Sequence, residues 1–164
     1  RCVQPLPIDD TAVLLATDGS QGTRRVNVTK GDAGWDVQAA WTNARFRPYF
    51  NDGVHHRGFC YGFDGNRLVC VDVATGEVRW EGKRCGGQLL LLPDEDLLLV
   101  LTEKGDVVLV PASSEGYEEK MRFKALSGKT WNHPVLANGR LFVRNAEEAA
   151  AFEWSLKGID KQAS

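Results

Sequence analysis

The ten residues from Val71 to Trp80 constrain the fold of this chain most strongly, because they combine a strand end, a tight turn and a second strand that closes on a large aromatic side chain. Two apolar runs, 59–63 and 67–71, precede this turn. The residues between the runs, Asp64-Gly65-Asn66, tolerate the positive φ of a hairpin turn. Two hairpins in succession predict an antiparallel meander of short strands.

Similar units recur along the chain. The large aromatic side chains of Trp41, Trp80 and Phe123 close comparable segments at a spacing of about 40 residues. Short polar turns give the same period, because each precedes an apolar run, at 11–16, 59–63, 97–101 and 141–143. Repeats of this length are typical of propeller blades, whereas a sandwich of two sheets gives no reason for the aromatics to recur in register. We therefore predict an all-β fold, a partial β-propeller built from four-stranded antiparallel meanders.

We expect a single partial propeller domain of about four blades, at about 6–41, 52–82, 88–124 and 133–153. The last blade lacks an outer strand before a polar tail, 154–164. Residues 146–151 have a helix-forming composition that opposes this assignment, and the repeat predicts a turn and a strand there instead.

The run Ala74-Thr75-Gly76 followed by Trp80 resembles the repeat signature of the pyrroloquinoline-quinone-type β-propellers, which include quinoprotein alcohol dehydrogenases and outer-membrane assembly lipoproteins. Two further stretches, 128–135 and 141–148, resemble bacterial quinone-binding-like repeat proteins. The likeness runs from about Pro5 to Phe152 and is weaker in the first unit, where residues 34–37 replace the Thr-Gly turn. It implies that Trp80 wedges between neighbouring blades, and that Trp41, Gly76 and Phe123 are likewise structural.

Complete rings in the resembling families usually have about seven or eight blades, so this chain is expected to be the C-terminal half of a longer protein or a natural half-propeller. It begins Arg1-Cys2 without a methionine, and we therefore expect part of the gene product to precede it. An incomplete ring leaves open blade edges, with Val13, Leu15 and Phe152 facing outward. The missing half or a second copy of the chain would cover them. The resemblance favours a periplasmic or other extracytoplasmic location, which the sequence itself does not determine.

Charge and hydropathy exclude two classes of partner. The net charge is −2, and the local basic clusters, such as Arg45 with Arg47, are too small to follow a phosphate backbone, so we expect no nucleic-acid partner. The most apolar stretch, 89–101, is interrupted by Pro93-Asp94-Glu95-Asp96 and falls short of the roughly 20 residues of a spanning helix. We expect no membrane span.

The cysteines, at positions 2, 60, 70 and 85, lack the spacing of a metal site. A two-residue turn at Gly65-Asn66 would place Cys60 opposite Val71 and Tyr61 opposite Cys70, with the two thiols on opposite faces and unable to form a disulfide. Quinone-dependent dehydrogenases of the resembling family hold calcium and place a vicinal cysteine pair over the quinone, and this chain has no adjacent cysteines. We expect no cofactor, no metal site and no catalytic residue.

The histidines and acidic clusters have ordinary structural interpretations. Neighbours in a strand point to opposite faces, so His55 and His56 cannot easily chelate one metal, and we expect one packed and one solvated ring. The carboxylates at 9–10, 94–96 and 147–148 fall at turns, where acidic residues commonly form the turn itself.

A candidate ligand site lies where the chain crosses from an outer strand to the next inner strand, because such crossings emerge on one face of a propeller. The aromatic, amide and guanidinium groups of these crossings belong to Arg47, Tyr49, Asn51, Gln88, Trp131, Asn132 and His133. Trp131 is the expected anchor. In the alternative interpretation, Trp131 and Tyr49 only pack blade against blade.

These observations favour a non-catalytic binding or protein-interaction module. Two alternatives remain open: a fragment of a quinone-dependent dehydrogenase whose cofactor ligands lie outside this chain, and an extracytoplasmic sensor domain of a signalling protein. The expected partners are the remainder of a longer propeller, a second copy of the chain, or another protein.

Overall fold

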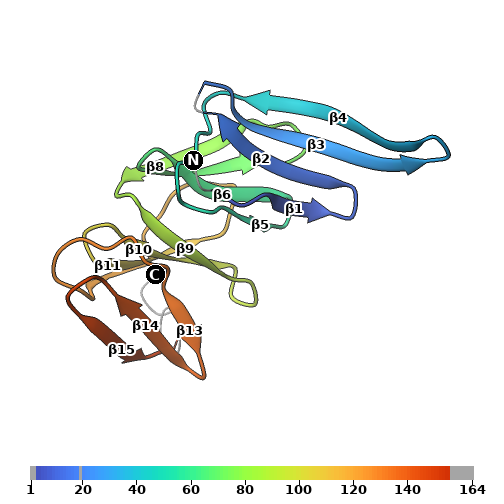
Figure 1. Cartoon of the computed structure of the whole chain (residues 1–164). Helices are drawn as coiled ribbons and strands as arrows, with labels where there is room; N and C mark the ends of the chain where they lie inside the picture. Colours follow the sequence, from blue (N-terminus) through green and yellow to red (C-terminus); the bar gives the residue numbers. More distant parts are fainter. Residues whose placement is uncertain (1–2, 19, 156–164) are drawn as a thin grey trace. The chain divides into compact units, whose positions relative to one another are not determined.

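The computed structural model describes residues 3–18 and 20–155 of the 164-residue chain. Every regular element in this part of the chain is a β-strand, and the strands form four antiparallel sheets (Figure 1), which confirms the all-β prediction. The chain divides into two compact units, Arg1–Arg84 with Ser114–Gly116 (unit 1) and Cys85–Ser113 with Tyr117–Ser164 (unit 2).

Unit 1 holds two four-stranded meanders in which strands adjacent in sequence are also neighbours in the sheet. The first sheet contains β1 (Leu6–Asp9), β2 (Ala12–Asp18), β3 (Gly22–Gly31) and β4 (Gly34–Asn43). The second contains β5 (Val54–His56), β6 (Phe59–Asp64), β7 (Arg67–Asp72) and β8 (Val78–Arg84).

Unit 2 holds a four-stranded and a three-stranded meander. The first contains β9 (Gly87–Leu92), β10 (Leu97–Thr102), β11 (Asp106–Pro111) and β12 (Met121–Lys124). The second contains β13 (Val135–Ala137), β14 (Arg140–Arg144) and β15 (Ala149–Glu153). Strand β15 includes the helix-prone alanines, because its full pairing with β14 outweighs their local propensity. The expected polar tail lies outside the described residues from 156 onward.

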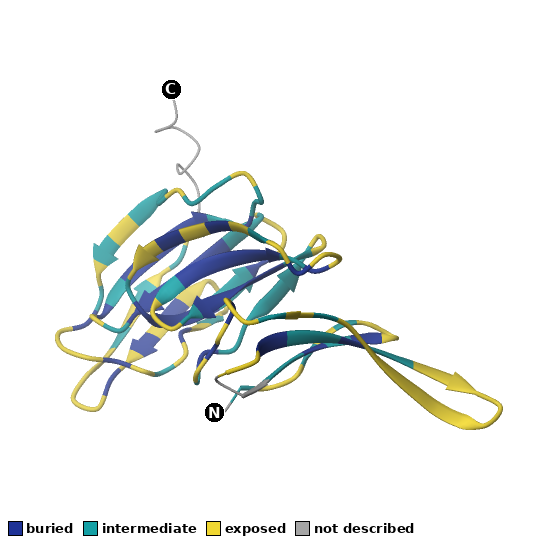
Figure 2. Cartoon of the chain, turned by 90° about the horizontal axis from the view of Figure 1, so that it is seen from above, coloured by how far each residue is buried: buried dark blue, intermediate teal, exposed yellow. Residues whose placement is uncertain are grey.

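Each unit has its own apolar core. In unit 1 the buried cluster consists of Leu14, Phe46, Cys60, Val69, Val71 and Val73. The buried cluster of unit 2 is mostly aliphatic, and it consists of Leu92, Leu99, Leu101, Val107, Leu109, Leu126, Leu141 and Val143. By contrast, the far end of the β3–β4 hairpin is exposed on all its residues from 29 to 40 (Figure 2), and Trp35 there is 69% exposed.

The predicted hairpin register between β6 and β7 is confirmed. Cys60 pairs with Val71 and Tyr61 with Cys70, and both cysteines are free thiols. The third cysteine that the structure describes, Cys85, is also free, whereas Cys2 lies outside the described residues.

Two side-chain expectations are wrong. Phe152 does not face outward, because it packs on the unit 2 core with its ring centroid 5.2 Å from that of Phe123. The outward face of this sheet instead carries Val135 and Phe142, paired opposite each other and 53% and 43% exposed. His55 and His56 are both half-buried, rather than one packed and one solvated.

Candidate functional site

The turn between β7 and β8 fixes the joint between the two sheets of unit 1. The Asp72 carboxylate accepts hydrogen bonds from the backbone N–H groups of Ala74 at 2.8 Å and Thr75 at 3.0 Å. Gly76 follows with φ +78°, and a Cβ there would lie 2.6 Å from the Trp41 ring. Only glycine allows both this backbone conformation and the close approach of the ring.

The four residues predicted to be structural make three different contacts; they are Trp41, Gly76, Trp80 and Phe123. Trp41 meets Gly76, and its Nε1–H donates to the Val73 carbonyl at 2.9 Å. Trp80 is 9% exposed, and its ring centroid lies 6.0 Å from that of Tyr61, across the intervening strand β7. Phe123 contacts Phe152 of the next sheet edge to face, at an interplanar angle of 72°.

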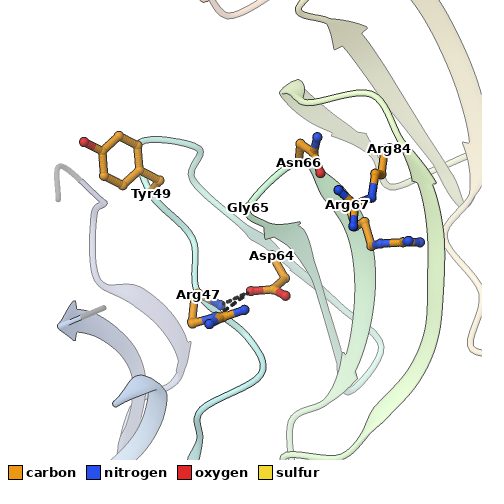
Figure 3. A pocket seen from close by; sticks show the side chains of 7 residues that line it. All are labelled: Arg47, Tyr49, Asp64, Gly65, Asn66, Arg67 and Arg84. Carbon is orange, nitrogen blue, oxygen red and sulfur yellow. Dashed lines mark hydrogen bonds and ion pairs between the residues drawn. The ribbon is translucent and has the colours of Figure 1, made fainter. Parts of the chain in front are cut away.

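A pocket of about 400 Å³ opens in unit 1 beside the β6–β7 hairpin (Figure 3). The segment that crosses from β4 to β5, residues 44–53, passes the hairpin there. The crossing contributes Arg47 and Tyr49, two of the predicted site residues. The hairpin and the end of β8 contribute the rest of the lining, which consists of Asp64, Gly65, Asn66, Arg67 and Arg84. Tyr49 is 60% exposed.

The charges of the pocket are not balanced. Asp64 Oδ1 accepts hydrogen bonds from both the backbone N–H of Arg47, at 3.0 Å, and its Nε, at 3.2 Å, so this carboxylate is engaged by one arginine. Arg67 and Arg84 stand directly opposite each other on β7 and β8. Arg67 Nη1 donates to the Gly82 carbonyl at 3.2 Å. The guanidinium group of Arg84, by contrast, has no hydrogen-bond or ion-pair partner among the described residues. The lining thus carries three arginines against one aspartate.

In unit 2, the crossing that precedes β13 carries the other predicted aromatic. Trp131 is 57% exposed, and Lys129 Nζ lies 4.4 Å from its ring centroid, within the range of a cation–π interaction. The Trp131 carbonyl accepts a hydrogen bond from Gln88 Nε2 at 3.2 Å. Asn132 is half-buried and His133 is exposed.

The seven predicted site residues therefore differ in accessibility. Asn51 and Gln88 are 2% and 3% exposed, so an incoming partner would not reach their amides without rearrangement. Tyr49 and Trp131 are the accessible aromatics, one in each unit. That all seven converge on one face stays a prediction.

Sequence reasoning missed Arg67 and Arg84. In the printed sequence the pocket arginines are far apart and look scattered. The signal was present in the hairpin register, because a sheet that pairs β7 with β8 places positions 67 and 84 side by side. Counting basic clusters along the chain cannot find such a group.

The buried thiols are held in their neutral form. Burial raises the pKa of Cys60 and of Cys70 to about 12, and that of Cys85 to about 11. Burial and the neighbouring His56 lower the pKa of His55. Over residues 3–18 and 20–155 no group of metal-ligating side chains is placed to hold a metal ion, and no helix there could cross a bilayer.

Four successive antiparallel meanders define a propeller-repeat protein, and the comparisons with known proteins agree. Residues 2–88, more than half of the chain, match the family model described as outer membrane protein assembly factor BamB. The chain belongs to this family of pyrroloquinoline-quinone-like propeller repeats. No curated protein sequence matches it.

Solved propeller structures show the same fold. The crystal structure of BamB from Moraxella catarrhalis matches with a TM-score of 0.67 at 17% identity, over 93% of this chain and 45% of that one. AztD from Citrobacter koseri matches with a TM-score of 0.58 at 13% identity, over 91% of this chain and 43% of that one. The chain thus spans less than half the length of these two similar structures.

Proposed function

We propose that this chain is a non-catalytic protein-interaction module, which meets its partner through the crossings between successive blades. The observation that carries this proposal is the exposure of one large aromatic side chain at a crossing in each unit, 60% for Tyr49 and 57% for Trp131. Solvent-exposed aromatics with a polar edge are frequent anchors of protein interfaces, because they bury a large area at a small cost in side-chain entropy.

The surroundings of these aromatics support a binding role. Trp131 is held under Lys129 Nζ, and its backbone carbonyl is tied to Gln88, so the ring is positioned before any partner arrives. Tyr49 stands at the edge of the arginine pocket. Preorganised groups lose little conformational freedom on binding.

The chemistry of the remaining side chains favours binding over catalysis. Burial raises the pKa values of the thiols of Cys60 and Cys70, which opposes their use as nucleophiles at neutral pH. The carboxylate of Asp72 accepts hydrogen bonds within its own turn. Membership of a family described as an outer membrane protein assembly factor also supports a protein partner.

A second contact surface is the outward face of the β13–β15 sheet. Val135 and Phe142 form an exposed apolar pair there, the kind of surface that a following blade covers in a longer propeller. We propose that either the remaining blades of a longer chain or a second copy covers this face. Light scattering after gel filtration should give a mass above the 18.1 kDa of one chain, with a dependence on concentration. A single species of monomer mass over a wide concentration range would contradict this part of the proposal.

The main test is partner capture from an extract of the source organism, quantified by mass spectrometry. Tyr49→Ala and Trp131→Ala should each lose proteins that the parent chain retains. Trp35→Ala is the matched control, because Trp35 is also highly exposed but lies on the β3–β4 hairpin. If all three variants retain the same proteins as the parent, the crossings are not the binding surface. Titration with pyrroloquinoline quinone and calcium should show no saturable binding; a stoichiometric site would favour the dehydrogenase alternative.

A further inference from the structure

The arginine pocket of unit 1 is built for an anion that the chain itself does not supply. Arg67 and Arg84 are direct cross-strand neighbours, and like charges in that position destabilise a sheet. The nearest acidic group in the lining, Asp64, is already engaged by Arg47 through two hydrogen bonds. A guanidinium pair without a carboxylate of its own costs stability, which a bound anion would restore.

From this geometry we propose that the pocket binds a pair of carboxylate side chains on an extended acidic segment of the protein partner. This inference rests on the proposed interaction function and names the chemistry of the partner. The planar guanidinium groups of Arg67 and Arg84 match carboxylates in a bidentate arrangement. Figure 3 shows these two side chains on adjacent strands, with Asn66 beside them at the hairpin turn and Tyr49 across the pocket.

The composition of the pocket favours carboxylates over a nucleic acid. Three arginines against one aspartate leave a surplus of two positive charges in the lining, enough to balance two carboxylates. A nucleic-acid surface needs a stripe of basic residues that tracks several phosphates, and three arginines gathered in one pocket do not form such a stripe. The exposed ring of Tyr49 adds a flat surface for the apolar part of a peptide.

The pocket has room for such a segment. Its volume of about 400 Å³ accommodates several side chains but not a folded domain. In an extended peptide, residues two apart point to the same side, so two glutamates separated by one residue present both carboxylates together. That spacing defines the probe.

The test uses the whole chain and fluorescence anisotropy of a labelled, C-terminally amidated peptide with two glutamates separated by one leucine. The matched peptide carries glutamine at both positions. We expect the glutamate peptide to bind saturably, at least tenfold more tightly than the glutamine peptide, and more weakly as salt is raised. A phosphoserine peptide and a short single-stranded oligonucleotide, measured in the same way, test whether the pocket prefers phosphate groups to carboxylates. Preference for either of these, or equal binding of the glutamine peptide, would overturn the proposal.

Matched variants locate the site. Arg84→Gln should weaken binding of the glutamate peptide about tenfold, because it removes one charge-assisted contact. Arg79→Gln is the control, because it makes the same change at an exposed position of the same strand outside the pocket lining, and binding should stay within about twofold of the parent. Equal losses in both variants, or no binding by the parent chain, would remove the site. In that case partner capture that still depends on Tyr49 and Trp131 would leave the broader interaction function standing.

Discussion

The two units close the joint between successive sheets with different side chains. In unit 1, the Trp41 ring covers Gly76 and its Nε1–H donates to the turn. In unit 2, Phe123 packs edge to face on Phe152, against an aliphatic cluster. A turn of similar hydrogen bonding occurs in unit 2 between the second and third strands of a sheet, whereas that of Asp72 joins the third and fourth. There Asn145 Oδ1 accepts from the N–H groups of Glu147 and Glu148 at 2.9 and 2.8 Å, in the manner of Asp72 in unit 1.

This comparison separates two requirements of the repeat. A tight turn between strands needs a side-chain oxygen that satisfies backbone N–H groups, and each of these two turns has one, although they join different strands of their sheets. The joint needs only a large apolar group of suitable shape, so the units fill it differently.

The units also differ in how they neutralise arginine. Arg122 of unit 2 donates to Glu119 and to Asp106, each at 2.9 Å, and these contacts, that with Glu119 foremost, raise the pKa of the guanidinium above its usual value. Arg84 of unit 1 faces another arginine instead. An arginine between two carboxylates serves the fold, whereas an arginine pair at a pocket is available to a ligand.

The largest expected effect is that of Trp80→Ala in unit 1. Removal of this buried ring should cost about 3–5 kcal/mol of the free energy of unfolding and lower the melting temperature by roughly 2–4 °C per kcal/mol. Phe123→Ala in unit 2 should cost about half as much, because that ring is only half-buried. Calorimetry of both variants measures the difference. A melting temperature for Trp80→Ala within about 2 °C of the parent would contradict the blade assignment.

The second prediction isolates the contact between Trp41 and its turn. Gly139→Ala in unit 2 should cost about 1 kcal/mol, because φ is +69° there and a Cβ would meet nothing within 4 Å. Gly76→Ala should cost about 2–3 kcal/mol, because it adds overlap with the Trp41 ring to a similar backbone strain. When Trp41 is also replaced by alanine, Gly76→Ala should cost no more than Gly139→Ala, because the ring that the added methyl group overlaps is gone. Urea unfolding of these variants provides the measurement, and equal costs for the two glycines would show that the ring does not restrict the turn.

The third prediction exchanges the turn residues of the two units. Asn145→Asp should cost about 1–2 kcal/mol, because the amide also donates from Nδ2 to the Ser127 carbonyl at 2.6 Å and a carboxylate cannot. Asp72→Asn should change stability by less than about 0.5 kcal/mol, since an amide oxygen can still accept both turn N–H groups. Chemical denaturation at neutral pH compares them. A larger loss of stability for Asp72→Asn than for Asn145→Asp would contradict the view that the turn of unit 1 needs only an acceptor whereas Asn145 is also needed as a donor.

The fourth prediction concerns alkaline pH. The pKa of Cys60 is raised in the folded state, so the unfolded chain ionises first, and the stabilisation present below pH 9 is lost as the pH rises toward 12. By pH 10 this buried thiol should account for a loss of about 1 kcal/mol. Unit 1 contains two such thiols, Cys60 and Cys70, and unit 2 contains Cys85 among the described residues. Hydrogen exchange at pH 8 and pH 10, resolved by peptide, should therefore show the greater loss of protection in unit 1. Rapid alkylation of Cys60 in the native chain at pH 7.5 would contradict its burial.

The smallest expected changes in stability are those of the arginine substitutions Arg84→Gln and Arg122→Gln. Arg84→Gln should leave stability unchanged or raise it by a few tenths of a kcal/mol, because it relieves the repulsion from Arg67. Arg122→Gln should lower stability by about 0.5–1 kcal/mol through the loss of its two carboxylate contacts. Thermal melts at low and moderate salt measure both. Destabilisation of Arg84→Gln by more than about 1 kcal/mol would mean that this arginine serves the fold rather than a ligand.

The local architecture could be predicted from the sequence because it depends on neighbours along the chain. The turn residues Asp64-Gly65-Asn66 set the register of β6 and β7, and the succession of short apolar runs separated by polar turns predicted the meander. The assignment of a strand at 149–153 needed the repeat as well, since local propensity alone favours helix there.

The pocket and the surface could not be predicted in this way, because they depend on residues that only the sheets bring together. Arg47, Arg67 and Arg84 come from a crossing, a hairpin and a strand end, and their charges become one site only when β7 pairs with β8 and the crossing passes beside them. The alternating apolar residues of β4, including Trp35, look like a buried face, yet the hairpin end is exposed. A strand pattern fixes which side chains share a face, and burial of that face depends on what the rest of the chain places against it.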